Sequence, residues 1–245
     1  MEHFLETSDT IGKGLGFSHF SLTHIFWLAV FALVAVTASL LYRRLDNEAA
    51  RTRFRRIFAL LIVGDELFKI ALLVAGGNYS VSYLPLHLCS INIFLIAAHA
   101  VKPTATLSHF LYAVDLPGAL FALFFPTWTK LPMANFMHIH SFTVHILLAT
   151  YPILLLASGE LKPRARFIPR CLVTLAALAV PVWIFNWIFD TNFMFLMEAE
   201  KGNPLYLFEQ ALGSHLWGFA VLIPAVLAVM FLPPVLFRRL GRKRT

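Results

Sequence analysis

Seven long apolar stretches constrain this chain more than any other feature of its sequence. A helix needs roughly 20 mostly apolar residues to cross about 30 Å of hydrocarbon. Hydrophobic residues make up 59% of the 245 positions and charged residues only 13%, whereas a water-soluble domain has about 25% charged residues. The sequence therefore predicts an all-α polytopic membrane protein, a seven-transmembrane helix bundle forming a single domain over residues 1–245. The expected spans are residues 20–42, 56–76, 84–101, 107–126, 138–158, 168–190 and 213–237.

Most of the 20 Lys and Arg residues fall in the segments on one side of these spans. The positive-inside rule assigns that side to the cytoplasm, so the N-terminus should lie outside and the basic C-terminus inside. Anionic lipid of the inner leaflet then explains the net charge of +7 without a nucleic-acid partner. The short loops and compact size favour a bacterial inner (plasma) membrane. The basic loop residues are Arg43, Arg44, Arg51, Arg53, Arg55, Arg56, Lys102, Lys162, Arg164, Arg166 and Arg170.

Polar and ionisable side chains lie mostly in the outer halves of the predicted spans. Such groups are costly in hydrocarbon and by default mark a site, a pathway or a pair. We expect them to line a cavity open to the outer leaflet; the alternative is that they pair with one another and join helices. The residues expected to bind substrate or support the site are His87, Asn92, Glu66, Lys69, His138, His140, Asn192 and His215.

Cys89 and His145 are expected at similar depth below the outer surface, as a nucleophile and its general base. Pro85 should open the third span, which puts the Cys89 thiol one turn into a helix, where the helix dipole favours thiolate. A packing role is the alternative for a lone membrane cysteine. Cys89 and Cys171 should lie in opposite leaflets, too far apart for a disulfide.

Three charged residues of the second span can interact on one helical face. Asp65 and Lys69 are four residues apart and Glu66 and Lys69 three, so either acid can pair with the lysine. The other acid could then orient a histidine or bind a polar headgroup. No His-Glu-x-x-His motif or tight Cys/His cluster is present, so we expect neither a metal nor another cofactor.

Two strings of residues, with His145, carry a resemblance to a known family. The string Leu-Pro-Leu-His-Leu-Cys over residues 84–89 and the string Asn-Phe-Met-Phe-Leu over 192–196, followed by Asn203 and Pro204, resemble the YwaF-like integral membrane proteins. An animal member of that family is a transmembrane acyltransferase that moves a fatty acyl chain between phospholipids and builds ether phospholipids through a Cys and a His.

The resemblance implies that Cys89 matches the nucleophile and His145 the base, with His140 and His138 as substitutes. More distantly, the architecture is similar to the androgen-induced intramembrane lipid hydrolases, which use Thr and His. The expected partners are membrane phospholipids and lysophospholipids.

Three functions remain open at this stage. The first is thiol-mediated acyl transfer or hydrolysis at the outer leaflet. The second is a seven-helix transporter or small-molecule binding protein with a relay through Glu66, Lys69 and Asp115, because buried charge is typical of transport. The third is a non-catalytic assembly partner. The acyl donor, the acceptor, the oxyanion-stabilising groups and the oligomeric state do not follow from the sequence.

Overall fold

The computed structural model describes residues 3–200 and 203–242, with side chains described as far as residue 233, and all its regular structure is helical. Short 3-10 turns and one π-helical turn separate the α-helices. The α-helices are α1 (Leu22–Arg43), α2 (Glu48–Ala75), α3 (Leu88–Val101), α4 (Ala105–Phe110), α5 (Leu116–Phe124), α6 (Phe136–Ala157), α7 (Ile168–Phe189), α8 (Pro204–Leu212) and α9 (Leu216–Arg242). The other turns are η1 (Val81–Tyr83), the π turn η2 (Leu111–Asp115), η3 (Ala165–Phe167) and η4 (Phe193–Phe195).

Five helical segments in the described residues are long and apolar enough to cross a membrane. They are α1, the continuous run from α4 through η2 to α5, α6, η3 with α7, and α9 as far as Pro233. The apolar helix α3 is shorter, with 14 residues, and α2 has 28 residues but carries many charges. All seven predicted ranges overlap helices, whereas α8 lies between two of them.

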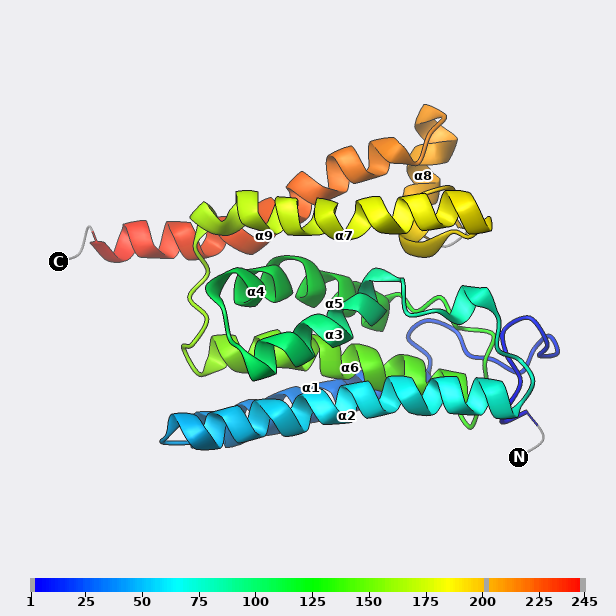
Figure 1. Ribbon diagram of the computed structural model, residues 1–245, viewed down its shortest axis with the longest axis horizontal. Coiled ribbons are helices and arrows are strands. Elements are labelled where there is room, and N and C mark those ends of the chain that lie inside the picture. The colour runs from blue at the N-terminus through cyan, green and yellow to red at the C-terminus, as the bar shows by residue number, and fades with distance from the viewer. Residues whose placement is uncertain (1–2, 201–202, 243–245) are drawn as a thin grey trace.

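Helix α6 forms the centre of the molecule. It packs against α1, α2, α3 and α5, and its buried residues run along its whole length. Figure 1 shows the long helices lying roughly along one axis, with α1 and α2 on one side of α6 and with α7, α8 and α9 on the far side of α3, α4 and α5. Helices α1, α7 and α9 bury few of their residues within the protein, so their large apolar side chains are available to lipid.

Two helices begin at other residues than the predicted spans. Helix α2 begins at Glu48, eight residues before the predicted start, because the side chain of Asn47 caps it by accepting a hydrogen bond from Ala50 N–H at 2.8 Å. Four arginines expected in a loop therefore lie on the first turns of α2. Helix α3 begins only at Leu88 with His87 as its N-cap residue, so Cys89 is its second residue and does not lie one turn inside it.

A buried guanidinium joins the helices at the end of the molecule that carries the α1–α2 connection. Arg55, only 2% exposed, donates to Tyr42 Oη at 2.7 Å and to Glu160 Oε2 at 3.1 Å. It also donates to Glu48 Oε1 at 2.5 Å, and Arg51 pairs with Glu160 at 3.1 Å. This network connects α1, α2 and the segment after α6 through Nη1 and Nη2 of Arg55, while its buried Nε has no hydrogen-bond partner in the described residues.

At the opposite end, buried histidines join the helices. His138, which was expected to support the site, is fully buried. Its Nε2 accepts a hydrogen bond from Trp27 Nε1–H at 2.9 Å, so its Nδ1–H donates to Leu131 O at 3.0 Å. His24 likewise accepts from Phe20 N–H and donates to Leu123 O. These bonds tie α1 to α6 and to the ends of α5 and its following loop.

We predict that Arg55→Gln destabilises the protein by about 3 kcal/mol, because it leaves buried acceptors and the Glu160 charge with fewer partners. The matched control is Arg53→Gln, since Arg53 is exposed and makes no ion pair in the described residues. Thermal or denaturant unfolding in detergent micelles measures both. Equal stability of the two variants would contradict a structural role for the Arg55 network.

Candidate functional site

A cluster of charged side chains joins α2 to α6 near the start of α3. Lys69 Nζ donates to Glu66 Oε1 at 2.6 Å, and both side chains are buried. His140 of α6 lies against both acids: its Nδ1 is 2.8 Å from Asp65 Oδ2, without good hydrogen-bond alignment, and its Nε2 is 3.6 Å from Glu66 Oε2. Lys69 therefore pairs with Glu66, and His140 approaches both acids, Asp65 more closely than Glu66.

Cys89 lies beside this charged cluster. It is a free, partly buried thiol on the first turn of α3, and it interacts electrostatically with Glu66 and Lys69. The first turn of a helix has backbone N–H groups without helical partners and carries partial positive charge. A thiolate at this position would be stabilised by those N–H groups, whereas the charge of the Lys69 ammonium is balanced by Glu66.

His145 has a ring nitrogen that is free to act as a base. Its Nδ1 lies 2.6 Å from Ser141 O, and a carbonyl can only accept, so Nδ1 carries the proton and Nε2 has an available lone pair. The ring stacks on Trp128, with centroids 5.2 Å apart and planes at 14°. This stacking holds the imidazole in one orientation.

Cys89 and His145 belong to neighbouring helices but share no hydrogen bond in the described residues. Helices α3 and α6 pack together and both begin at the same end of the molecule (Figure 1). The hydrogen bond between His99 Nδ1 of α3 and Tyr151 Oη of α6, 2.9 Å long, shows which residues of the two helices lie at the same height. Counting ten residues back from each partner puts Cys89 level with Ser141, so His145 lies four residues, or about 6 Å, deeper.

The remaining predicted histidines have different environments. Both ring nitrogens of His138 are occupied by the bonds to Trp27 and Leu131, which leaves it no free lone pair. His140 belongs to the charged cluster. His215 donates through Nε2 to Leu196 O at 3.3 Å, so it holds the loop that contacts His87.

A strained loop covers the start of α3. His87 Nδ1 accepts a hydrogen bond from Met194 N–H at 3.3 Å, and its ring contacts Phe193 and Phe195. Met194 and Phe195 both have positive φ angles, 58° and 55°, which bulky residues rarely adopt. The string that carried the family resemblance is thus the loop that contacts the residue preceding the first turn of α3.

Two asparagines hold that loop in shape. Asn186 of α7 donates to Phe193 O and accepts from Phe193 N–H, each at 2.9 Å. Asn192 accepts from Met197 N–H at 3.1 Å and donates to Glu198 O at 3.0 Å. The amide of Asn192 is therefore engaged within its own loop, and Asn186, which was not among the expected site residues, holds the same loop from α7.

Asn92 and Asp115 form a second buried polar contact. Asp115 ends the π turn η2, is 1% exposed, and neither of its carboxyl oxygens has a hydrogen-bond partner in the described residues. Asn92 is its polar neighbour, although the two side chains do not form a well-aligned hydrogen bond, and Asn92 Oδ1 is also without a partner. Asn92 follows Cys89 by three residues, so it extends the polar face of α3.

A third polar group was missed by the sequence reasoning because its members come from three helices. His99 bonds to Ser108 Oγ at 2.8 Å as well as to Tyr151 Oη. Ser108 Oγ also lies 2.9 Å from Thr104 O and must donate to that carbonyl. Ser108 therefore accepts from His99, which shows that this group is a structural contact and that Ser108 is not activated by the histidine.

Two surface hollows of about 370 and 350 Å³ lie near the starts of α2 and α7. Neither is lined by Cys89 or His145, so the outer-leaflet cavity predicted from the sequence stays a prediction. In the described part of the chain, no three His, Cys, Asp or Glu side chains form a group that could hold a metal ion.

Residues 19–233 match the model of the TMEM164 family. The chain belongs to the TMEM164 family. The matched range includes α1 to α8, the apolar part of α9, Cys89, His145 and the charged cluster. No curated protein and no solved structure matches the chain. Family membership and the apolar helices together identify a multi-pass membrane protein, while the YwaF-like resemblance stays a prediction.

We predict strong coupling between Glu66 and Lys69 in this TMEM164 family member. Glu66→Gln or Lys69→Met alone should destabilise the fold by about 3 kcal/mol, because either leaves a buried charge without its partner. The double variant should lose clearly less than the sum of the two. Unfolding measured in micelles gives the cycle, and additive losses would argue against a direct ion pair.

Proposed function

We propose that this protein is a membrane lipid acyltransferase or acyl hydrolase that forms an acyl-thioester on Cys89. The observation that carries the proposal is the place of the thiol: a free cysteine on the first turn of α3, next to the Glu66–Lys69 pair. His145, on the neighbouring helix α6, supports it with an unprotonated Nε2. Nucleophilic catalysis by cysteine requires a base that can take the proton of the thiol.

The first half-reaction consumes a phospholipid ester. His145 Nε2 takes the Cys89 proton, and the thiolate attacks the ester carbonyl, forming the C–S bond. The ester C–O bond then breaks, and the lysophospholipid oxygen leaves with the proton held by the imidazolium. In the second half-reaction His145 takes a proton from a lysophospholipid hydroxyl or from water, and the oxygen attacks the thioester carbonyl. The C–S bond then breaks, and the imidazolium returns the proton to the Cys89 sulfur. Catalytic contacts are often longer before substrate binds, so His145 would approach Cys89 during turnover.

The developing oxyanion needs hydrogen-bond donors near Cys89. Asn92, Asn192 and backbone N–H groups are three candidate sources of such donors. The amide of Asn192 is bound to Glu198 O, which favours Asn92 and the first-turn N–H groups of α3. Asp115, as the polar neighbour of Asn92, would then act as a positioning residue.

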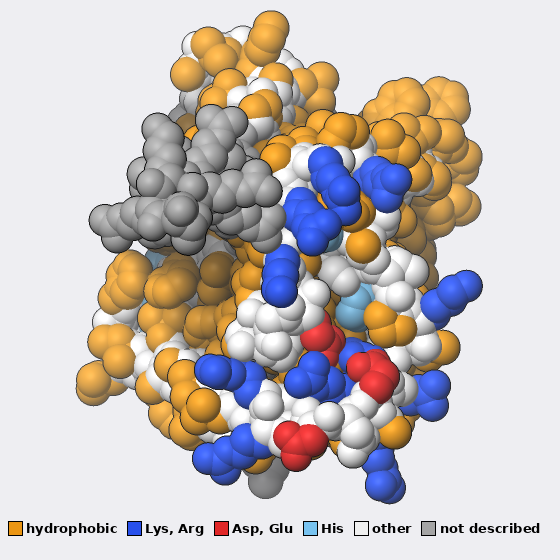
Figure 2. All heavy atoms as spheres, turned by 90° about the vertical axis from the view of Figure 1, so that its left-hand side faces the viewer, with side chains coloured by type: hydrophobic (Ala, Val, Ile, Leu, Met, Phe, Trp, Pro, Cys, Tyr) orange, Lys and Arg blue, Asp and Glu red, His pale blue; other side chains and the backbone are white. Residues whose placement is uncertain are grey.

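The proposed function includes a membrane topology with seven spans. Helices α2 and α3 would complete the five apolar spans, with the N-terminus outside and the C-terminus in the cytoplasm of a bacterial cell. Figure 2 supports this orientation, because Lys and Arg side chains outnumber acidic ones on the face that includes the α1–α2 and α6–α7 connections. In this orientation Cys89 serves the outer leaflet and reacts with its phospholipids and lysophospholipids.

The alternative function is a transporter or small-molecule binding protein, and two observations favour it. Lys69, Glu66, His140 and Asp65 form a continuous series of close polar contacts between α2 and α6. Asp115 is a buried carboxyl group without a partner in the described residues, as expected of a group that binds a proton or a substrate.

We predict that purified protein in phospholipid nanodiscs carries an acyl adduct that intact mass spectrometry detects and hydroxylamine removes. Cys89→Ala should abolish the adduct, because it removes the attacking sulfur. Cys171→Ala is the matched control, since Cys171 is the other free thiol, and it should keep the adduct. Retention of the adduct in Cys89→Ala would exclude Cys89 as the nucleophile.

We further predict that His145→Gln slows adduct formation by about 100-fold or more, the usual contribution of a general base. His138→Gln is the control: it disrupts the bond to Trp27 and should lower stability, while the rate per folded molecule changes little. Time-resolved mass spectrometry after mixing with lipid gives both rates. Equal rates for His145→Gln and wild type would assign the base to another group, with His140 as the next candidate.

A further inference from the structure

The start of α2 carries a groove that is separate from the Cys89 site. This hollow, of about 370 Å³, is open to the surroundings and is formed by the face of a single helix. We refer to it as the α2 groove. Its lining residues are Glu48, Ala49, Thr52, Arg53, Arg56, Ile57 and Leu60.

The only carboxylate of the groove is already bound within the protein. Glu48 Oε1 accepts from Arg55 at 2.5 Å and from Thr52 Oγ1 at 3.2 Å. The hydrogen bond from Arg55 keeps the pKa of Glu48 below its ordinary value, so this carboxylate is ionised at neutral pH and its charge is balanced by a buried guanidinium. Glu48 therefore leaves most of the positive charge of the groove uncompensated.

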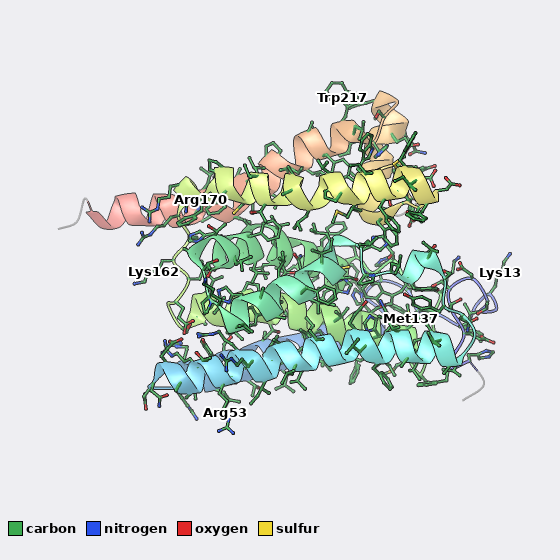
Figure 3. All side chains as sticks on the ribbon, viewed as in Figure 1. Lys13, Arg53, Met137, Lys162, Arg170 and Trp217 are labelled. Carbon is green, nitrogen blue, oxygen red and sulfur yellow. The ribbon has the colours of Figure 1, made fainter. Side chains whose placement is uncertain are left out.

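No carboxylate neutralises the two arginines of the groove in the described residues. Arg53 and Arg56 are exposed and make no ion pair in the described part of the chain. They are three residues apart and so project from one side of α2. Figure 3 shows Arg53 pointing away from the helix bundle. Two guanidinium groups thus face outward where α2 enters the membrane.

The wall of the groove becomes apolar deeper along α2. Ile57 is 51% exposed and Leu60 is 71% exposed, although both are large hydrophobic residues. Leu60 follows Arg53 by seven residues, which is about 10 Å along the helix axis. Along the groove, two cations are followed by an apolar surface. A phospholipid has a matching order, with an anionic phosphate followed by hydrocarbon chains.

We propose that the α2 groove binds one anionic phospholipid of the leaflet at this end of the molecule. Its phosphate contacts the guanidinium groups of Arg53 and Arg56, which suit phosphate oxygens geometrically. One acyl chain lies along Ile57 and Leu60. A zwitterionic lipid binds less well, because its headgroup cation faces the same arginines. This site does not depend on acyl transfer at Cys89.

Native mass spectrometry of the full chain in detergent tests the proposal, with phosphatidylglycerol and phosphatidylcholine of identical acyl chains as probes. Wild type should retain its first phosphatidylglycerol at about tenfold lower lipid concentration than phosphatidylcholine, since each arginine near an anionic headgroup contributes favourably. The double variant Arg53→Gln, Arg56→Gln should lose this preference. The control variant Arg43→Gln, Arg44→Gln removes the same charge outside the groove and should keep the preference within about twofold.

Three results would overturn the proposal. They are equal affinity of wild type for the two lipids, equal loss of preference in both double variants, and displacement of phosphatidylglycerol by millimolar inorganic phosphate, which would indicate a site for a small anion. The variant Arg53→Lys, Arg56→Lys keeps the charge and serves if the glutamine variant does not fold. It should retain part of the preference, because lysine lacks the forked geometry of arginine, and an unchanged preference would argue against guanidinium contacts.

Discussion

The pairing of the buried cations of α2 determines how the rest of the bundle can pack. An unpaired charge is very costly in a low-dielectric interior, so Arg55 and Lys69 must each lie where carboxylates reach them. They are 14 residues apart, close to four helical turns, and therefore lie on one face of α2 about 21 Å apart. One is held by Glu48 and Glu160 and the other by Glu66. Glu48 and Glu66 belong to α2 itself. The contacts that place α2 beside α1 and α6 are therefore those of Arg55 with Tyr42 and Glu160, and those of His140 with Asp65 and Glu66.

The candidate site is arranged around that fixed helix. With Glu66 facing inward, its second oxygen and the neighbouring Asp65 approach His140 of α6. Helix α3 is placed so that its second residue, Cys89, lies near Lys69. The three elements that meet here are joined by electrostatic contacts at one end and by the His99–Tyr151 bond at the other. The thiol and the imidazole are therefore held by a rigid frame, and their remaining separation follows from the register of α3 against α6.

The sequence located the helices well because a bilayer demands a minimum apolar length, and that requirement is visible without a structure. Helix ends were less predictable: the start of α2 depends on a single capping side chain, that of Asn47, and α3 starts at Leu88 without any side-chain cap. The environment of His138 was missed because Trp27, its hydrogen-bond donor, is 111 residues away along the chain. The Glu66–Lys69 pair was one of two permitted by spacing, and only side-chain geometry could select it. Helix α8 and its preceding loop have mixed polarity and gave no periodic signal.

The loop of residues 190–198 links a helix exposed to lipid with the first turn of α3. Its shape is set by Asn186 near the end of α7, and its residues Phe193 and Met194 contact His87, two positions before Cys89. Exposed membrane helices adjust their tilt to the thickness of the surrounding hydrocarbon. A change in the tilt of α7 therefore moves the loop against His87, which makes bilayer thickness a physical variable of the environment of the thiol.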